Sequence, residues 1–413
     1  MKQAVPHRLQ VAAGVVPGLS AMLGAGLLTG LAPAAGAAGR WLLAGIVIGF
    51  SIALCSGFST GDQSRRYAGV GGGYLYTRHQ LGVLPGRMAG SAALVGRICA
   101  GAAVAGTFGV YVLPEHPVYA AIGVSLAATA LDAVGFRPPR GLVIGVVVTV
   151  VLTLTLYVAV CFSIAPPDPV PLPADVAGSD NVGGLLPAAG LMFFGFLGFE
   201  HVTSSTDRTY SVRQMHIAVP VLMIVTLVAG LAVAGATLHQ LGGPRMAVSP
   251  APLRDALAAA DGQFFQPLIS GVAGIATMFG LLLAVASIRR TLSAMAEFSD
   301  VPPSLSIVGP RGVSAPAAVL SGVAIAAAAA LLNPPQAIGV AACLLLFYYA
   351  FTNASARLLT PADRTWPRRA ACFGLGLSVL VGMNMSVKYL VVVVLVMTAG
   401  CVSGAIISRY ARK

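Results

Sequence analysis

The feature that most constrains this chain is a series of apolar stretches that recurs along its whole length. Each stretch holds about 18 or more mainly apolar residues, which is enough for a helix to cross roughly 30 Å of hydrocarbon. Hydrophobic residues make up 57% of the chain and charged residues only 9%, too few charges to cover a soluble protein of this size. We therefore predict an all-α polytopic membrane protein with about twelve transmembrane helices, at residues 10–32, 41–60, 87–112, 118–134, 141–164, 184–205, 217–239, 264–288, 315–332, 336–358, 368–385 and 388–408.

The positive charges indicate how these helices are oriented. If the N-terminus lies inside and the spans alternate, 20 of the 25 Lys and Arg residues fall on the cytoplasmic side. Arg97 lies within a span, and the four outside residues are Arg40, Arg245, Arg254 and Lys388. This asymmetry follows the positive-inside rule, so we expect a protein of the inner membrane with both termini in the cytoplasm. The net charge of +12 does not indicate a nucleic-acid partner, since basic clusters with interleaved aromatic residues are lacking.

The N-terminal stretch also has features of a secretory signal peptide. Basic residues precede it, and the small residues at 32–39 resemble a cleavage site. The run is longer than a usual secretory core and contains Pro17 and five glycines, so we interpret it as the first span. The cysteines and histidines are scattered without metal-ligand spacing, and we expect neither metal nor other cofactor.

The chain is organised as one membrane domain, residues 1–413. The longest external connections are the proline-rich segment 165–183 and the segment 240–263. Glycine-rich sequences lie within the first span, at 18–30, and within the sixth, at 193–201. They serve either as close-packing positions or as breaks whose free backbone groups line a cavity. Breaks at these two positions would indicate inverted five-helix repeats, 10–164 and 184–358, followed by two further helices at 368–408.

Four stretches of the chain form an ordered set: Gly24-Ala25-Gly26, then Asp62 with 66–76 and Gly82, then 193–200, and last 293–297. Together they resemble the amino acid–polyamine–organocation (APC) permeases. Gly24-Ala25-Gly26 is similar to the family's glycine break in the first span, and 193–200 is similar to its sixth-span motif. Asp62 with 66–76 and Gly82 resembles the segment after its second span, and 293–297 the end of its eighth. The resemblance implies a leucine-transporter-type fold of 5+5 inverted repeats, and the compact length is most similar to the family's neutral amino-acid exporters.

The sequence departs from the family pattern at several points. Ala68 replaces a proline, and residues 207–212 replace an acidic motif that supplies inner-gate ion pairs in the family. Arg289 stands where asparagine is common, and the fifth span lacks the lysine of some proton-coupled members. The glycines at 71–73 could also suggest a phosphate-binding loop, but no Gly-Lys-Ser/Thr follows and no strand precedes them.

An amino-acid substrate would use these breaks in two ways. The half-helix N-terminus near Gly26 suits a carboxylate, and carbonyl groups near Gly198 could accept hydrogen bonds from an ammonium group. The resemblance implies that Phe194 covers the substrate and that Arg97 faces the pocket. The predicted substrate site consists of Ala21, Gly24, Ala25, Gly26, Arg97, Phe194, Leu197, Gly198 and Ala284.

Arg97 and Glu200 are the two ionisable residues within predicted spans. Such residues are costly in a membrane and usually serve a function. Glu200 is either a structural carboxylate paired with an arginine or a proton-responsive group that couples and gates transport. Arg97 is alternatively an anchor that pairs with another span. Hydroxyl groups between spans one and eight are too few to favour sodium, so we expect coupling to protons or exchange of a counter-substrate.

The predicted function is secondary transport of neutral, apolar amino acids by alternating access. The expected partners are the amino-acid substrate, protons or a counter-substrate, and the lipid bilayer. Two alternatives remain from other classes. One is a receptor or complex subunit that retains the permease fold without transporting, for which the altered 207–212 loop is the main argument. The other is a membrane enzyme, which would need catalytic side chains converging at one depth; we find none in the sequence.

Overall fold

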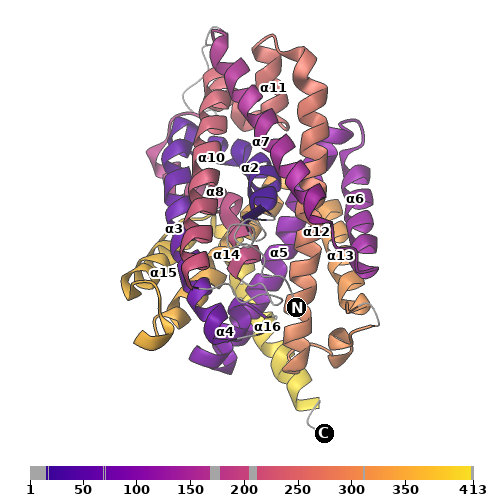
Figure 1. Ribbon diagram of the computed structural model, residues 1–413, viewed down its shortest axis with the longest axis vertical. Coiled ribbons are helices and arrows are strands. Elements are labelled where there is room, and N and C mark those ends of the chain that lie inside the picture. The colour runs from indigo at the N-terminus through magenta and orange to yellow at the C-terminus, as the bar shows by residue number, and fades with distance from the viewer. Residues whose placement is uncertain are drawn as a thin grey trace, which may run out of the picture.

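The computed structural model describes residues 15–16, 18–67, 69, 71–167, 177–203, 212–309 and 312–410. Every regular element in these ranges is helical (Figure 1). The helices are α2 (Leu27–Ala38), α3 (Leu42–Arg66), α4 (Gly73–Leu81), α5 (Val83–Val112), α6 (Pro117–Ala133), α7 (Arg140–Ser163), α8 (Leu185–Phe193), α9 (Glu200–Thr203), α10 (Val212–Val248), α11 (Pro252–Ala259), α12 (Gln266–Glu297), α13 (Ala315–Leu331), α14 (Pro334–Ala356), α15 (Arg368–Met383) and α16 (Val387–Tyr410). Two further helical segments matter below: η1 (Ser20–Gly26) and η4 (Phe194–Phe199).

The described part of each of the twelve predicted spans lies mainly on a helix or on consecutive helical segments. By length and composition, eight helical segments among the described residues can cross a membrane, one of which, Ser20–Arg66, includes both α2 and α3. The apolar helices α6 and α13 are shorter, with 17 residues each, and α15 has 16. Twelve crossings therefore remain a prediction. The short helices α4 and α11 lie between spans and were not predicted, because neither is long and apolar.

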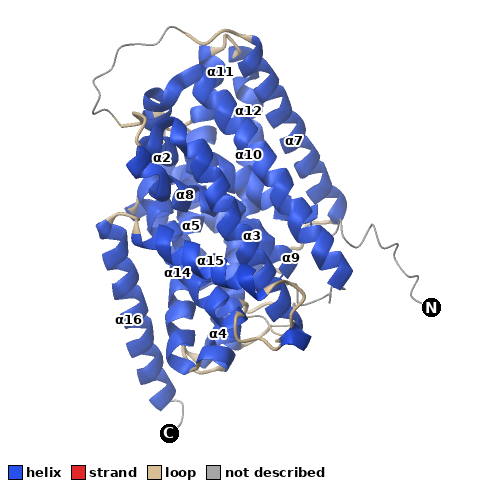
Figure 2. Ribbon diagram, turned by 90° about the vertical axis from the view of Figure 1, so that its left-hand side faces the viewer, coloured by secondary structure: helices blue, strands red, loops and turns tan. Residues whose placement is uncertain are grey.

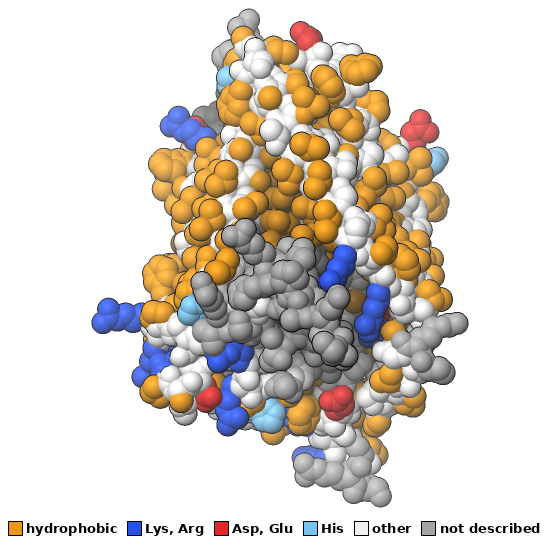
Figure 3. Space-filling model, viewed as in Figure 1, with side chains coloured by type: hydrophobic (Ala, Val, Ile, Leu, Met, Phe, Trp, Pro, Cys, Tyr) orange, Lys and Arg blue, Asp and Glu red, His pale blue; other side chains and the backbone are white. Residues whose placement is uncertain are grey.

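The surface of the bundle is apolar where a soluble protein would be polar. The most apolar 18 residues of α16 have a mean hydropathy of 2.6, yet only 17% of them are buried. An exposed helix that is apolar on all sides is stable only in lipid. Hydrophobic side chains also cover much of the described face in Figure 3, while most Lys and Arg side chains visible there lie in its lower half. The protein is therefore a helical multi-pass membrane protein.

Helix α14 forms the centre of the bundle, and 83% of its most apolar 18-residue stretch is buried. It packs against α5, α3 and α15, and Figure 2 shows α16 at the edge of the same group. The α14 sequence is rich in alanine and leucine around Tyr348 and Tyr349, and nearly all of these side chains are buried. Helix α14 contacts α8, which Figure 1 shows in the middle of the bundle, and η4. Segment η1 packs mainly against α12 and η4.

The two predicted helix breaks do depart from α-helical geometry, but neither unwinds. Ser20–Gly26 is π-helical and continues directly into α2. Phe194–Phe199 is a 3-10 helix between α8 and α9. The flanking residues Leu19, Leu27 and Glu200 all keep right-handed helical φ and ψ. Such short π and 3-10 segments change the hydrogen-bond register of a helix and are frequent at functional sites.

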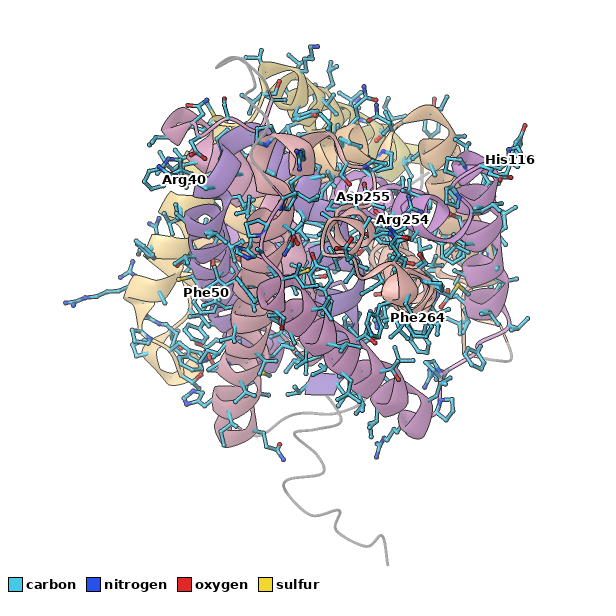
Figure 4. All side chains as sticks on the ribbon, turned by 90° about the horizontal axis from the view of Figure 1, so that it is seen from above. Arg40, Phe50, His116, Arg254, Asp255 and Phe264 are labelled. Carbon is cyan, nitrogen blue, oxygen red and sulfur yellow. The ribbon has the colours of Figure 1, made fainter. Side chains whose placement is uncertain are left out.

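The two ends of the bundle carry different elements. One end carries α4 and the C-terminus, and we refer to it as the α4 end; the opposite end carries α11 (Figure 1). Figure 4 looks down on that opposite end, with Arg254 and Asp255 of α11 near the middle and Arg40 and His116 near the rim. There Arg40 pairs with Asp180 at 3.0 Å. Several residues of the sequence predictions lie outside the described residues. They include the segments 168–176 and 207–211, Pro17 and Ala68, and four of the predicted cytoplasmic charges, Lys2, Arg8, Arg208 and Arg311.

Candidate functional site

The predicted site residues, although far apart in the sequence, meet around one cavity. This central cavity encloses about 650 Å³, part of it open to solvent. Nine of the ten residues predicted for binding and gating line it: Ala21, Ala25, Gly26, Arg97, Phe194, Leu197, Gly198, Glu200 and Ala284. They come from η1, α5, η4, α9 and α12. The tenth, Gly24, packs against α12 instead.

Close backbone contacts hold η1 in place beside the cavity. A Cβ atom on Gly24 would lie 2.5 Å from the Cβ of Ala276, and one on Gly26 would lie 2.7 Å from the Cα of Gly195. On the other side, a Cβ on Gly280 would meet the Cβ of Ala25 at 2.5 Å. No real side chain tolerates such distances, so these glycines are required for η1 to contact α12 and η4. The glycines therefore serve packing and also place two irregular helices against the cavity.

The two charged residues predicted within spans form an ion pair. Arg97 Nη2 donates to Glu200 Oε1 at 2.7 Å, and the two side chains are only 12% and 19% exposed. The Tyr349 hydroxyl also donates to Glu200. Arg97 further contacts Thr291 Oγ1 at 3.1 Å and the Tyr348 hydroxyl at 3.3 Å, with its guanidinium carbon 5.0 Å from the Tyr348 ring centroid. Sequence reasoning considered a partner for each charge but did not pair them with each other, and it missed both tyrosines.

The ion pair separates the central cavity from a second one. This α4-side cavity measures about 380 Å³ including space open to solvent. It is lined by Arg97, Glu200 and Ser287, which also line the central cavity. Its remaining lining residues are Thr60, Gly71, Gly72, Gly73, Tyr76, Thr203, Arg290, Thr291 and Tyr348. Moving Arg97 or Glu200 would therefore open one cavity to the other. The pair is in the position of a gate.

The glycines at 71–73 connect this gate to α4. Gly73 donates its backbone N–H to the Tyr348 hydroxyl at 3.0 Å, and Tyr348 in turn contacts Arg97. Gly72 adopts φ +52°, a conformation that other residues rarely take. A Cβ on Gly73 would overlap Thr352 and Tyr348. The loop is thus a close-packed connection onto α14.

A second group of charges stabilises the α4 end. Asp300 is buried and accepts hydrogen bonds from Arg78 Nη1 at 2.5 Å, Arg87 Nε at 2.8 Å and the Tyr74 hydroxyl at 2.7 Å. Burial, together with the hydrogen bond to Asp300, raises the pKa of Tyr74 above its ordinary value, so Tyr74 remains a donor. Arg87 also reaches Ser408 at 2.9 Å. These bonds tie α4, α5 and α16 to the segment after α12.

Two residues of the family comparison are involved in similar structural contacts. Asp62 accepts hydrogen bonds from the backbone of Thr365 at 3.1 Å and of Trp366 at 3.2 Å, which fixes the segment before α15 to the end of α3. Arg289 is one of the departures from the family pattern. It forms a bidentate ion pair with Asp132 of α6, from Nε to Oδ2 at 2.7 Å and from Nη2 to Oδ1 at 3.1 Å. Neither residue lines the central cavity.

Comparisons with known proteins indicate the class to which this protein belongs. The chain is 34% identical over 365 residues to uncharacterized transporters of Mycobacterium tuberculosis, in strains CDC 1551 and H37Rv, and of Mycobacterium bovis. The match covers 88% of this chain and 82% of each relative. The chain belongs to this family of transporters. No protein-family model matches the chain.

Membership in the transporter family agrees with the architecture. A transporter needs a membrane-spanning bundle, an internal cavity and a barrier that can open, and the described residues supply candidates for all three. The relatives' names give no substrate. Because the relatives are transporters, enzymatic activity is not indicated. Among the described residues, no three His, Cys, Asp or Glu side chains come together in a way that could hold a metal ion.

Proposed function

We propose that this transporter moves small neutral amino acids with apolar side chains, and that the central cavity is its substrate site. The walls of the cavity are mainly apolar, with small residues such as Ala21, Ala25 and Ala284 and the larger Phe194 and Leu197. Its charged lining consists of the Arg97–Glu200 pair, with His201 beside it. Apolar walls with few polar groups are typical of a small-molecule site. A bulky or charged substrate side chain would find no complementary partner on these walls.

The observation that carries the proposal is the Arg97–Glu200 pair at the floor of this cavity. A zwitterionic amino acid carries both a carboxylate and an ammonium group. The carboxylate can replace Glu200 beside Arg97 while the ammonium replaces Arg97 beside Glu200, so neither protein charge is left unpaired. A substrate with a single charge would replace only one side of the pair, so Arg97 or Glu200 would lose this contact at 12–19% exposure, which is costly. The gate therefore favours zwitterions.

The irregular segments η1 and η4 support the same substrate class. Gly26 and Gly198 line the cavity, one from each segment, and neither has a side chain to cover its backbone. Changes between π, α and 3-10 geometry shift the backbone hydrogen-bond register in this region, which makes these segments candidates to offer backbone donors and acceptors to a ligand. Donors at η1 suit a carboxylate and acceptors at η4 suit an ammonium group, in the manner of discontinuous transporter helices.

We further propose that the chain shares the fold of the APC permeases, with inverted repeats at 10–164 and 184–358 and two further helices at 368–408. The charge asymmetry supports a cytoplasmic location of the α4 end. Opening of the Arg97–Glu200 pair then connects the central cavity to the cytoplasm, as alternating access requires. A proton that binds Glu200 would release Arg97 and couple opening to the proton gradient; exchange of a second substrate through the same gate is the alternative.

Transport by purified protein in proteoliposomes tests this function. Labelled leucine, methionine, alanine, arginine and glutamate would each be followed, with protein-free liposomes as the blank. We expect saturable transport of leucine or methionine, competed by neutral amino acids. Strong transport of arginine without leucine or methionine would refute the substrate class. Binding of leucine with no transport would instead indicate a receptor that retains the fold.

A further inference from the structure

Two consecutive arginines near the α4 end of α12, Arg289 and Arg290, differ in whether an acidic side chain pairs with them. Arg289 is neutralised by Asp132, with both carboxylate oxygens engaged. Arg290 lines the α4-side cavity and is partly buried. Within the described ranges it forms no ion pair and no hydrogen bond. A guanidinium group in a partly buried site normally has an anionic partner.

Among the described residues that line the α4-side cavity, positive charge is in excess. Arg97, Arg290 and Glu200 line it, and the Glu200 carboxylate already accepts bonds from Arg97 and Tyr349. The other lining groups include the hydroxyl groups of Thr60, Thr203, Ser287 and Thr291 and the backbone of Gly71–Gly73. The hydroxyl groups of Thr60, Thr203 and Thr291 donate to backbone carbonyls four residues earlier in this structure, so they would have to rotate to donate to an anion.

We infer that the α4-side cavity is a second substrate site, in which Arg290 binds the carboxylate of the amino acid on its way between the gate and the α4 end. This inference rests on the proposed function. When the substrate passes the gate and Arg97 and Glu200 pair again, its carboxylate loses Arg97 and needs another cation. Arg290 lines the next cavity on that path. In this closed state the cavity has free space for only about one water molecule, so its lining would have to move apart for the amino acid to bind there.

Charge-selective modification of an introduced thiol tests the inference without requiring transport. Thr60 lines the α4-side cavity and does not line the central cavity. Its hydroxyl group donates only to backbone carbonyls of its own helix, those of Ser56 at 2.9 Å and Gly57 at 3.2 Å. Thr60→Cys would be made in a Cys372→Ser/Cys401→Ser background, and reaction rates with the anionic reagent MTSES and the cationic reagent MTSEA compared in nanodiscs. Should this thiol prove unreactive, Ser287→Cys, which lines both cavities, provides the same comparison.

We expect the anionic reagent to be favoured, and Arg290→Gln to lower that preference about tenfold. Arg290→Lys should retain most of it because it keeps the charge. The matched control is Asp132→Asn with Arg289→Gln, which removes the neighbouring paired arginine together with its partner and should leave the preference unchanged. An equal preference in Arg290→Gln would overturn the inference, because it would mean that Arg290 is already neutralised by the chain itself.

Ligand protection identifies the anion. L-leucine and acetate should slow MTSES modification in the Arg290 protein but not in Arg290→Gln, whereas L-leucinamide, which lacks the carboxylate, should not protect. Chloride that protects as well as leucine would overturn the assignment to a substrate carboxylate. Protection by acetate in a protein that transports no amino acid would refute the proposed function while leaving the carboxylate site in place.

Discussion

The energetic coupling of Arg97 to Glu200 can be measured with a double-mutant cycle. Glu200→Gln keeps an acceptor for the Tyr349 hydroxyl but leaves the Arg97 guanidinium, 12% exposed, without its counter-charge. Breaking a buried pair from one side costs about 3–5 kcal/mol. Because Glu200 is 19% exposed, we expect about 3 kcal/mol for this substitution. Arg97→Met alone should also be destabilising, since the partly buried Glu200 carboxylate then loses its contact with the Arg97 guanidinium.

The double variant Arg97→Met/Glu200→Gln leaves no buried charge unpaired. It should therefore be less destabilised than the sum of the single variants, by at least about 1.5 kcal/mol. The free energy of unfolding would be measured in mixed micelles by denaturant titration. A matched control is the exposed pair Arg66–Asp363, at 3.4 Å with 55% and 32% exposure, whose coupling should be below about 1 kcal/mol. Additive effects at Arg97 and Glu200 would show that the pair does not hold the barrier closed.

Three further outcomes are expected. Glu200→Gln should flatten the pH–rate profile of transport and leave substrate affinity within a few-fold, because no proton can then compete with Arg97; an unchanged profile would make Glu200 structural. Gly26→Ala should destabilise the protein by about 1–3 kcal/mol and abolish transport, since its Cβ would meet the Gly195 backbone, while Gly376→Ala, which meets nothing within 4 Å, should not; equal effects in thermal unfolding would refute the packing argument. An external thiol reagent should label Asp175→Cys and miss Arg368→Cys, and the reverse pattern would refute the twelve-span topology.

The sequence predicted the helices and the members of the site better than their interactions. Apolar length alone indicates a span, because lipid requires the backbone to be satisfied within each helix. The glycines at 24–26 and 195–198 predicted where helical geometry changes. They could not predict π and 3-10 segments in place of unwound ones, since that outcome depends on neighbours such as Ala276 and Gly195.

The gate residues that were missed share a different cause. Tyr348 and Tyr349 lie in an apolar run and cannot be told from core aromatics by sequence alone. Only packing shows their hydroxyl groups directed at Arg97 and Glu200. Arg290 was counted among the cytoplasmic charges because it follows an apolar stretch. Helix α12 continues to Glu297, which brings Arg290 beside the α4-side cavity.

The contacts of Arg97 also bear on how the barrier opens. Its partners lie on three different helices: Glu200 on α9, Thr291 on α12 and Tyr348 on α14. Tyr348 additionally holds Gly73 at the start of α4. Rotation of one side chain would leave several of these partly buried groups unsatisfied, each at a cost of about 1–3 kcal/mol. Movement of the helices that carry the partners, with a zwitterion bound between Arg97 and Glu200, avoids most of that cost. Opening is therefore expected to be a concerted change that includes α4, and its rate should depend on the presence of substrate.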